Sequence, residues 1–301
     1  MRLRETFSES VIVAEDIPID PEEGLDMLKA MVEREQPDLI IGTSMGGMYA
    51  EQLYGFDRIL VNPALQMGET MASHGMIGKQ RFLNKRADGQ EEFIVTKALV
   101  KKYKALTEQN FTHVDDEERQ RVFGLFGRND PVVHTYDLFR QHYPQAILFN
   151  GEHRMDDSSF FHAVVPIIRW IDDRQEGRQR PIIYIGMETL RDSFGKPTSS
   201  SQKAFRFLTE HYQVFFLCDA LSCHPDDMGK DSDWLMLTFD APAWNHTVFC
   251  NQRQLLLGDC LVAKTAVDDF MGTCIEFGSD TFKTWEEIIV YFQRLLGLDV
   301  V

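Results

Sequence analysis

Three residues of the types used in nucleophilic catalysis stand shortly after apolar segments of the chain. Ser44 follows "LIIGT", Asp130 follows "VFGLFGRN", and His153 follows "AILFNGE". A serine hydroxyl needs a base to take its proton, and a histidine base needs a carboxylate to orient its ring. The order serine, aspartate, histidine therefore predicts a triad, with Ser44 as nucleophile, His153 as general base and Asp130 as the orienting group.

The serine lies in "GTSMG", a G-x-S-x-G motif between a predicted strand and a predicted helix. Gly42 and Gly46 would let the strand and the helix approach closely, since glycine has no side chain and tolerates strained backbone. The turn would also aim the backbone N–H of Met45 at a developing oxyanion, near the positive end of the helix. Alone, the motif fits a structural turn equally well, so the nucleophile depends on its partners.

Asp130 and His153 are the partners that the sequence favours. Three other histidines fall at or within predicted helical stretches, which favours surface positions: His134, His142 and His162. Two other acids are too close to His153 in the sequence to orient it: Asp156 and Asp157. The alternative for Asp130 is a turn-forming role, because a proline follows it.

Alternating strands and helices would position these residues. Strands are expected within residues 10–16, 38–42, 58–65, 121–132 and 146–149, and helices within 20–36, 47–55 and 160–175. Such alternation is typical of a parallel sheet covered by helices, so the fold class is α/β.

Residues 66–118 interrupt this pattern with polar sequence rich in Met, Lys and Gln. They predict an inserted helical lid, with its clearest helix over residues 91–109. The methionines from Met67 to Met76 could line an acyl pocket, because methionine adapts to irregular apolar ligands. Lid-core packing is favoured for them over that role.

A second alternating series follows the charged bridge "DDRQEGRQRP". The domain boundary is therefore expected at residues 176–177, with a first domain over 1–176 and a second over 177–301. Strands are expected within residues 182–187, 214–221, 247–250, 260–264 and 274–279, helices within 197–212, 251–258 and 285–297, and a loop up to about residue 243.

The first half resembles the YqiA-like esterases, a compact α/β-hydrolase family, over roughly residues 10–172. The matching stretches are "PDLIIGTSMGGMYAEQ", "RILVNPAL", "GLFGRNDPVV" and "FNGEHR". The resemblance implies acyl-ester hydrolysis with Ser44, His153 and Asp130 in the roles given above. That family begins with a strand and a His-Gly turn that supplies a second oxyanion donor, and "MRLRETFSES" contains neither. Either the sequence is internal to a longer protein, or "VIVAED" pairs directly with "DLIIG" through a right-handed crossover.

Residues 181 to about 297 resemble the haloacid-dehalogenase-like phosphatases, and more closely their 5'(3')-deoxyribonucleotidase branch. The matching stretches are "RPIIYIGMETLRDSF", "FRFLTEHYQVFFLCDAL", "RQLLLGDCLVAK" and "GTCIEFGSDTFKTWEEIIVYF". The family implies an Asp nucleophile, an acid/base Asp and an Asp pair for Mg²⁺. Those positions hold Gly186, Glu188 and the pair Ala263-Lys264, and Arg253 stands near the family's Lys. Glycine cannot form an aspartyl-phosphate and lysine repels Mg²⁺, so the resemblance predicts a degenerate, metal-free domain without phosphatase activity.

Composition narrows the class of partner. The net charge of −16 over 301 residues argues against binding nucleic acid or an anionic membrane surface, because both would repel the protein. No apolar run approaches the ~18 residues of a membrane span, and the N-terminus lacks a signal core. The five cysteines form no CxxC pair, which fits reduced thiols. A cytoplasmic protein is therefore expected.

These features together predict a serine esterase that acts on a small-molecule acyl ester without cofactor or metal. The second domain would serve packing, dimerisation or regulation, so a homo-oligomer stays open. The alternative is a non-catalytic interaction or regulatory protein, which the missing oxyanion turn favours, and a Mg²⁺-dependent nucleotidase is a third hypothesis.

Overall fold

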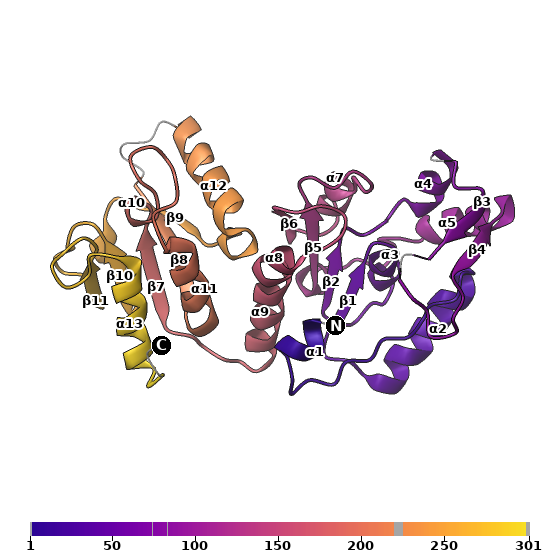
Figure 1. The fold of residues 1–301 in the computed structure, drawn as a ribbon, viewed down its shortest axis with the longest axis horizontal. Helices are drawn as coiled ribbons and strands as arrows, with labels where there is room; N and C mark the ends of the chain where they lie inside the picture. Colours follow the sequence, from indigo (N-terminus) through magenta and orange to yellow (C-terminus); the bar gives the residue numbers. More distant parts are fainter. Residues whose placement is uncertain (1, 74, 83, 220–224, 299–301) are drawn as a thin grey trace. The chain divides into compact units, whose positions relative to one another are not determined.

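The structure, a computed structural model, describes residues 2–73, 75–82, 84–219 and 225–298 (Figure 1). The chain packs as two compact units. The first comprises Met1–Gly124 and Val133–Gln145, and the second comprises Leu125–Val132 and Ala146–Val301. This division passes through one strand and groups residues by packing, so the boundary at residues 176–177 stays a prediction.

A four-stranded sheet runs in the order β1-β2-β5-β6. Its strands are β1 (Ile40–Thr43), β2 (Arg58–Val61), β5 (Val122–Gly127) and β6 (Ala146–Phe149). β1 and β2 are parallel, with Gly42 opposite Leu60, and every residue of β2 is buried. A strand buried along its whole length is expected in a parallel sheet whose two faces are covered. The α/β class is confirmed.

The first unit contains seven described helices. They are α1 (Arg2–Thr6), α2 (Pro21–Glu35), α3 (Met45–Glu51), α4 (Met67–Ser73), α5 (Lys97–Thr107), α6 (Glu118–Arg121) and α7 (Tyr136–Arg140). α2 begins as its sequence predicts, because Asp20 accepts from the N–H of Glu22 and Pro21 opens the first turn. α3 and α5 share one apolar core, in which Tyr49 and Tyr103 are buried.

The insertion differs from the predicted helical lid. It contains an antiparallel pair, β3 (Gly78–Arg81) and β4 (Glu92–Val95), so the helix expected over residues 91–109 is wrong in its first part. "EFIV" carries the aromatic and β-branched residues that favour strands, and Thr96 then caps α5 by accepting from the N–H of Leu99. Met67 and Met71 are buried in the core, which supports packing as the role of these methionines.

The strand expected at residues 10–16 is wrong. Residues 11–18 form neither helix nor strand, and the Val11 side chain is 92% exposed. Pairing of "VIVAED" with "DLIIG" is therefore also wrong, since the neighbour of β1 in the sheet is β2. Four apolar residues followed by acids bury too little surface to offset the entropy of ordering an extended segment.

The second unit contains a five-stranded sheet in the order β11-β10-β7-β8-β9, with all neighbours parallel. The strands are β7 (Ile182–Gly186), β8 (Gln213–Cys218), β9 (Thr247–Phe249), β10 (Cys260–Ala263) and β11 (Thr273–Glu276). Each lies where an apolar run predicts a strand. Continuous apolar runs are typical of parallel strands that are covered on both faces.

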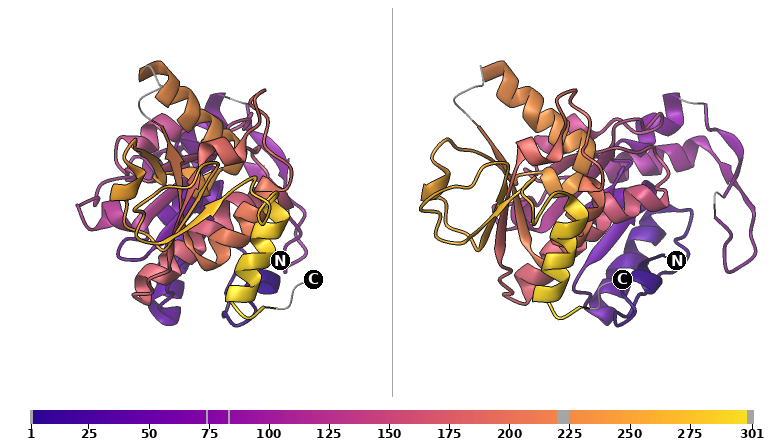
Figure 2. Two further views of the ribbon diagram at one scale, coloured as in Figure 1. Left: turned by 90° about the vertical axis from the view of Figure 1, so that its left-hand side faces the viewer. Right: turned by 60° about the vertical axis from the view of Figure 1, so that its left-hand side comes forward.

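The helices of this unit are α8 (Asp157–Ser159), α9 (Val165–Gln175), α10 (Met187–Leu190), α11 (Ser201–His211), α12 (Pro225–Phe239) and α13 (Trp285–Leu295), with short helical turns η1 (Phe160–Val164), η2 (Ala241–Ala243) and η3 (Arg253–Leu255). α11, α12 and α13 contribute to one core on one face of the sheet. α13, drawn yellow in Figure 2, packs beside α11.

Two predictions fail in this unit. A loop was expected up to about residue 243, but α12 occupies most of it, and the helix expected within residues 251–258 is only the single turn η3. "PDDMGKDSDWLMLTF" has a glycine and several aspartates, which are weak helix formers. Burial of Leu235 and Phe239 in the core outweighs that local preference.

No helix among the described residues is long and apolar enough to cross a membrane. The four described cysteines are free thiols: Cys218, Cys250, Cys260 and Cys274. Cys223 lies outside the described residues.

Candidate active site

Ser44 occupies a strained turn between β1 and α3. Its backbone has φ 53° and ψ −115°, a region that residues other than glycine rarely adopt. Such a conformation costs on the order of 1–3 kcal/mol and persists only where the surroundings enforce it. Here the Ser44 N–H donates to Val61 O at 2.9 Å, and the Ser44 carbonyl accepts from the N–H of Ala64 at 2.9 Å. The turn is thereby fixed to the end of β2.

The glycines around Ser44 differ in how much space each would leave for a side chain. A Cβ on Gly42 would lie 2.3 Å from the carbonyl oxygen of Gly46, and one on Gly47 would lie 2.8 Å from Cβ of Pro63. Gly46 itself has open space within 4 Å. The prediction that Gly46 must lack a side chain is therefore wrong, and Gly47 is the second glycine that close packing requires. The double glycine of "SMGG" is the sequence signal that could have identified it.

Met45 is the first residue of α3, immediately after Ser44. The first N–H groups of a helix have no partner within the helix, and the Ser44 side chain does not cap this one. The Met45 side chain packs against the apolar core. This packing holds the backbone of the residue whose N–H is the expected oxyanion donor.

The structure brings Asp130 and His153 together. His153 Nδ1 lies 2.8 Å from Asp130 Oδ2, and the Asp130 side chain is only 2% exposed. The other oxygen, Oδ1, accepts from the N–H of Val132 at 2.7 Å. Asp130 therefore fills both roles considered for it, since it closes its own turn and engages the histidine. A carboxylate at Nδ1 selects the tautomer with its proton there, so Nε2 is the basic nitrogen.

Each of the three predicted residues follows a strand of the same four-stranded sheet. Ser44 comes directly after β1, Asp130 follows β5 and His153 follows β6. Asp130 and His153 lie in the second compact unit and Ser44 lies in the first, so the pairing of Ser44 with His153 stays a prediction.

The loops that carry Asp130 and His153 are joined by backbone hydrogen bonds. The N–H of Arg128 donates to Phe149 O at 2.9 Å, and the N–H of Asn129 donates to Gly151 O at 3.0 Å. A Cβ on Gly127 would lie 2.7 Å from the Gly151 carbonyl oxygen. Glycine is therefore needed at this crossing, and the two loops are held as one piece.

The rival histidines have other surroundings. His134 is exposed, and His142 stacks on Phe111 with ring centroids 4.0 Å apart. His162 lies in η1, where burial and the charge of Arg206 lower its pKa.

A second strand-end cluster lies at the five-stranded sheet. Arg253 donates to both carboxylate oxygens of Glu188, at 2.7 and 3.2 Å, and to Asp219 at 3.0 Å. Burial opposes ionisation of Glu188, but the hydrogen bonds and charge of Arg253 hold its pKa below the ordinary value. Glu188 and Asp219 also line a cavity of about 310 Å³.

The residues present in this cluster do not fit a divalent cation. The guanidinium of Arg253 already occupies the position between the two carboxylates, and Lys264 lines the same cavity. A Cβ on Gly186 would lie 2.5 Å from Glu188 Oε1, so the turn has no room for a nucleophilic side chain while Glu188 stays in place. No group of three or more metal-binding side chains occurs among the described residues.

Comparison with known proteins gives two results. Residues 4–168 match the model of an uncharacterised protein family, UPF0227. The chain is also similar to a protein of Vibrio phage KVP40 named "Putative 5'(3')-deoxyribonucleotidase", with 26% identity over 127 residues. That similarity covers 40% of this chain and 70% of the phage protein.

Proposed function

The chain belongs to the uncharacterised protein family UPF0227, and from this membership and the strand-end geometry we propose that it is a serine hydrolase that cleaves carboxylic esters. The observation that carries the proposal is the backbone of Ser44, with φ 53° and ψ −115° between β1 and α3. A serine presented on a strained strand-to-helix turn is the nucleophile elbow of the α/β-hydrolases. The Asp130–His153 hydrogen bond supplies an oriented base of the matching kind.

In the proposed reaction, Nε2 of His153 takes the proton of Ser44 Oγ while Oγ attacks the ester carbonyl carbon. The imidazolium is stabilised by Asp130, which stays ionised. As the tetrahedral intermediate collapses, His153 gives its proton to the leaving alcohol. Water then attacks the acyl-enzyme with His153 again as base, which releases the acid and restores Ser44.

The oxyanion of the intermediate would accept from the N–H of Met45. One such donor is typically worth about 10²–10³ in rate. The second donor is not assigned. A small activated ester is the substrate class to test first.

The C-terminal strand-end cluster has no proposed catalytic role. The name of the phage relative points to nucleotide hydrolysis, but the guanidinium of Arg253 bonds both carboxylates that could bind a metal ion there. We therefore propose that residues 177–301 support the hydrolase and do not act as a phosphatase.

Fluorophosphonate labelling tests the proposal. The probe phosphonylates an activated serine, so wild type should be labelled and Ser44→Ala should not. Ser193→Ala is the matched control, because Ser193 lines the other cavity and should leave labelling unchanged. Hydrolysis of p-nitrophenyl acetate should fall in parallel with labelling.

Two results would sink the proposal. The first is a folded wild-type protein that is neither labelled nor active on the ester, which would favour the non-catalytic interaction protein. The second is Ser44→Ala labelled as strongly as wild type, which would show that a residue other than Ser44 reacts with the probe. Mg²⁺-dependent release of phosphate from nucleotides would instead support the third hypothesis.

A further inference from the structure

The loop that carries His153 has a hydrogen-bond partner far away in the sequence. The loop starts at Asn150, directly after β6, and the N–H of Asn150 donates to Oδ1 of Asp240 at 2.7 Å. Asp240 stands between α12 and η2, 90 residues further along the chain. The C-terminal region thus contributes an acceptor three residues before the proposed general base.

The Asp240 side chain is buried and its backbone is strained. It is 5% exposed, and its backbone has φ 57° and ψ −136°, which is strained for any residue other than glycine. Burial raises the pKa of its carboxyl, while the hydrogen bond from Asn150 and the charge of Arg128 oppose that rise. Burying a carboxylate costs free energy unless hydrogen bonds compensate for the lost water. The hydrogen bond from Asn150 therefore helps to hold Asp240 in its position.

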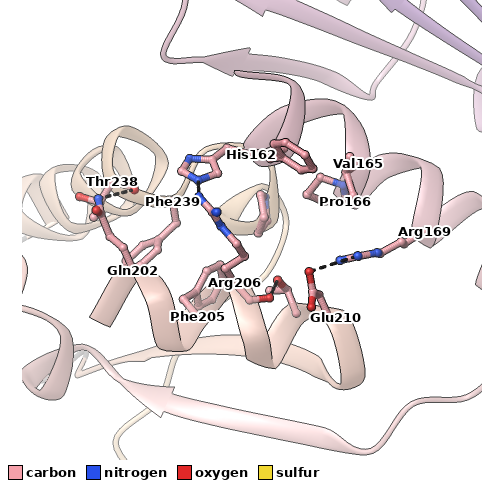
Figure 3. Close-up of a pocket in the computed structure, with 13 residues that line it drawn as sticks. His162, Val165, Pro166, Arg169, Gln202, Phe205, Arg206, Glu210, Thr238 and Phe239 are labelled. Carbon is pink, nitrogen blue, oxygen red and sulfur yellow. Dashed lines mark hydrogen bonds and ion pairs between the residues drawn. The ribbon is translucent and has the colours of Figure 1, made fainter. Parts of the chain in front are cut away.

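His162 and Arg206 form a neighbouring contact. Arg206 of α11 approaches Nε2 of His162 at 2.6 Å, as Figure 3 shows. A guanidinium can only donate, so Nε2 must accept and the ring is neutral with its proton on Nδ1. Nδ1 of His162 lies 3.9 Å from Oδ2 of Asp240, which is beyond hydrogen-bond distance.

Side-chain contacts also join the elements around Asp240. Arg169 of α9 pairs with Glu210 of α11 at 3.2 Å (Figure 3), and Trp170 of α9 stacks on His246 with centroids 4.6 Å apart. A small, partly open pocket of about 40 Å³ lies between η1, α9, α11 and η2. Asp240 is 5% exposed beside these packed elements.

We propose that Asp240 is a positioning residue of the hydrolase site. It anchors the N–H of Asn150 and thereby sets where the loop presents His153 to its substrate. This inference rests on the proposed function, because it assigns the C-terminal region a part in that reaction. A displacement of about 1 Å at a catalytic group can cost about 10²-fold in rate, so loss of the anchor should be visible in kcat.

The test uses Asp240→Gly and Asp240→Asn in the full chain. Glycine accepts a positive φ without strain, so this variant removes the acceptor and relaxes the backbone. Asparagine keeps an oxygen that can accept from Asn150. Asp231→Ala is the matched control, since Asp231 is also a buried acid, on α12, and pairs with Arg191 at 2.8 Å.

Asp240→Gly should lower kcat for p-nitrophenyl acetate by about 10- to 100-fold with little change in KM. Asp240→Asn should recover most of that loss, and Asp231→Ala should match wild type. Hydrogen exchange measured by mass spectrometry should rise in the peptide over residues 148–154 only in Asp240→Gly. Equal kcat and equal exchange in Asp240→Gly and Asp231→Ala would overturn the inference.

A readout independent of activity separates this inference from the proposed function. The C2 proton signal of His153 in NMR spectra, assigned by comparison with His153→Asn, reports the surroundings of the ring in each variant at one fixed pH. If wild type proves inactive, a chemical shift moved by Asp240→Gly and restored by Asp240→Asn still supports the anchor. A chemical shift unmoved by Asp240→Gly overturns it.

Discussion

Asp130 and Glu188 are both carboxylates that follow buried parallel-sheet strands, but they have different partners. Asp130 bonds an imidazole at 2.8 Å, and Glu188 bonds a guanidinium at 2.7 Å. An imidazole gains and loses a proton near neutral pH, whereas a guanidinium keeps its charge. The same place in an α/β fold can therefore support proton transfer or only hold a static ion pair, and the partner of the carboxylate decides between them.

The largest effect should come from Asp130→Asn. The new side-chain amide would present its NH₂ group or a weaker acceptor to Nδ1 of His153, so the ring would take the wrong tautomer and kcat should fall by about 10⁴-fold. The amide oxygen of the variant would still accept from the N–H of Val132, so stopped-flow ester hydrolysis can be compared at equal folded fraction. Asp219→Asn at the other cluster should leave hydrolysis unchanged. Equal activity of Asp130→Asn and wild type would remove Asp130 from the triad.

The strand-end turns should differ in their tolerance of a methyl group. Gly42→Ala would drive Cβ into the backbone of Gly46, which cannot move without displacing α3, and should cost more than about 3 kcal/mol in unfolding free energy. Gly186→Ala meets only the end of the Glu188 side chain and should cost less. Gly46→Ala is the control with open space. Urea denaturation that ranks Gly46→Ala as the worst of the three would contradict this geometry.

A third test concerns pH and uses a buried glutamate, Glu51, and a partly buried one, Glu188. Glu51 in the first unit is fully buried, and burial raises its pKa to about 6 even though Tyr143, Arg58 and Phe111 oppose the rise. A raised carboxyl pKa means that the folded state favours the protonated form. Stability from this group is therefore full below about pH 4.5 and falls by about 2 kcal/mol as pH rises through 6.

Glu51→Gln should remove that loss, because glutamine keeps an oxygen for Tyr143 and carries no charge. The variant should exceed wild type in unfolding free energy by about 2 kcal/mol at pH 7 and match it near pH 4. Glu188 should behave in the opposite way: its lowered pKa contributes stability at neutral pH that is lost on acidification. Glu188→Gln should therefore destabilise at pH 7, and a gain in stability there would refute the ion-pair account.

The smallest expected effect is that of Mg²⁺. An ion bound at about 100 times its Kd would stabilise the fold by about 2.7 kcal/mol, whereas Arg253 leaves no place for one between Glu188 and Asp219. Thermal unfolding should therefore be the same in millimolar Mg²⁺ and in EDTA. A Mg²⁺-dependent rise in Tm that disappears in Glu188→Gln would show a metal site after all.

The sequence predicts those parts of the fold whose signal is local. Continuous apolar runs identify all nine strands of the two larger described sheets, because such runs are typical of parallel strands in a covered sheet. α12 is missed because its helical state depends on burying Leu235 and Phe239 in a core built by distant elements. Residues 10–16 are apolar enough to suggest a strand, but pairing also requires a neighbouring strand, which local sequence does not reveal.

The candidate site likewise contains residues that the local sequence identifies and residues that it does not. Ser44, Asp130 and His153 carry local signals, since each has a characteristic residue type after a strand. Asp240 carries none, because its hydrogen bond with Asn150 joins residues 90 positions apart in the chain. Gly47 is an intermediate case. The sequence shows a second glycine there, but it does not show that this glycine lies close to Pro63.

The backbone conformation of Ser44 has a consequence for engineering this protein. A positive φ suits glycine better than serine, so Ser44→Gly should make the fold more stable while it removes the proposed nucleophile. A selection or design protocol that rewards only thermal stability would therefore drift toward glycine at this position. Any effort to produce a more robust variant would need to fix residue 44 and seek its gains elsewhere, for instance at Glu51.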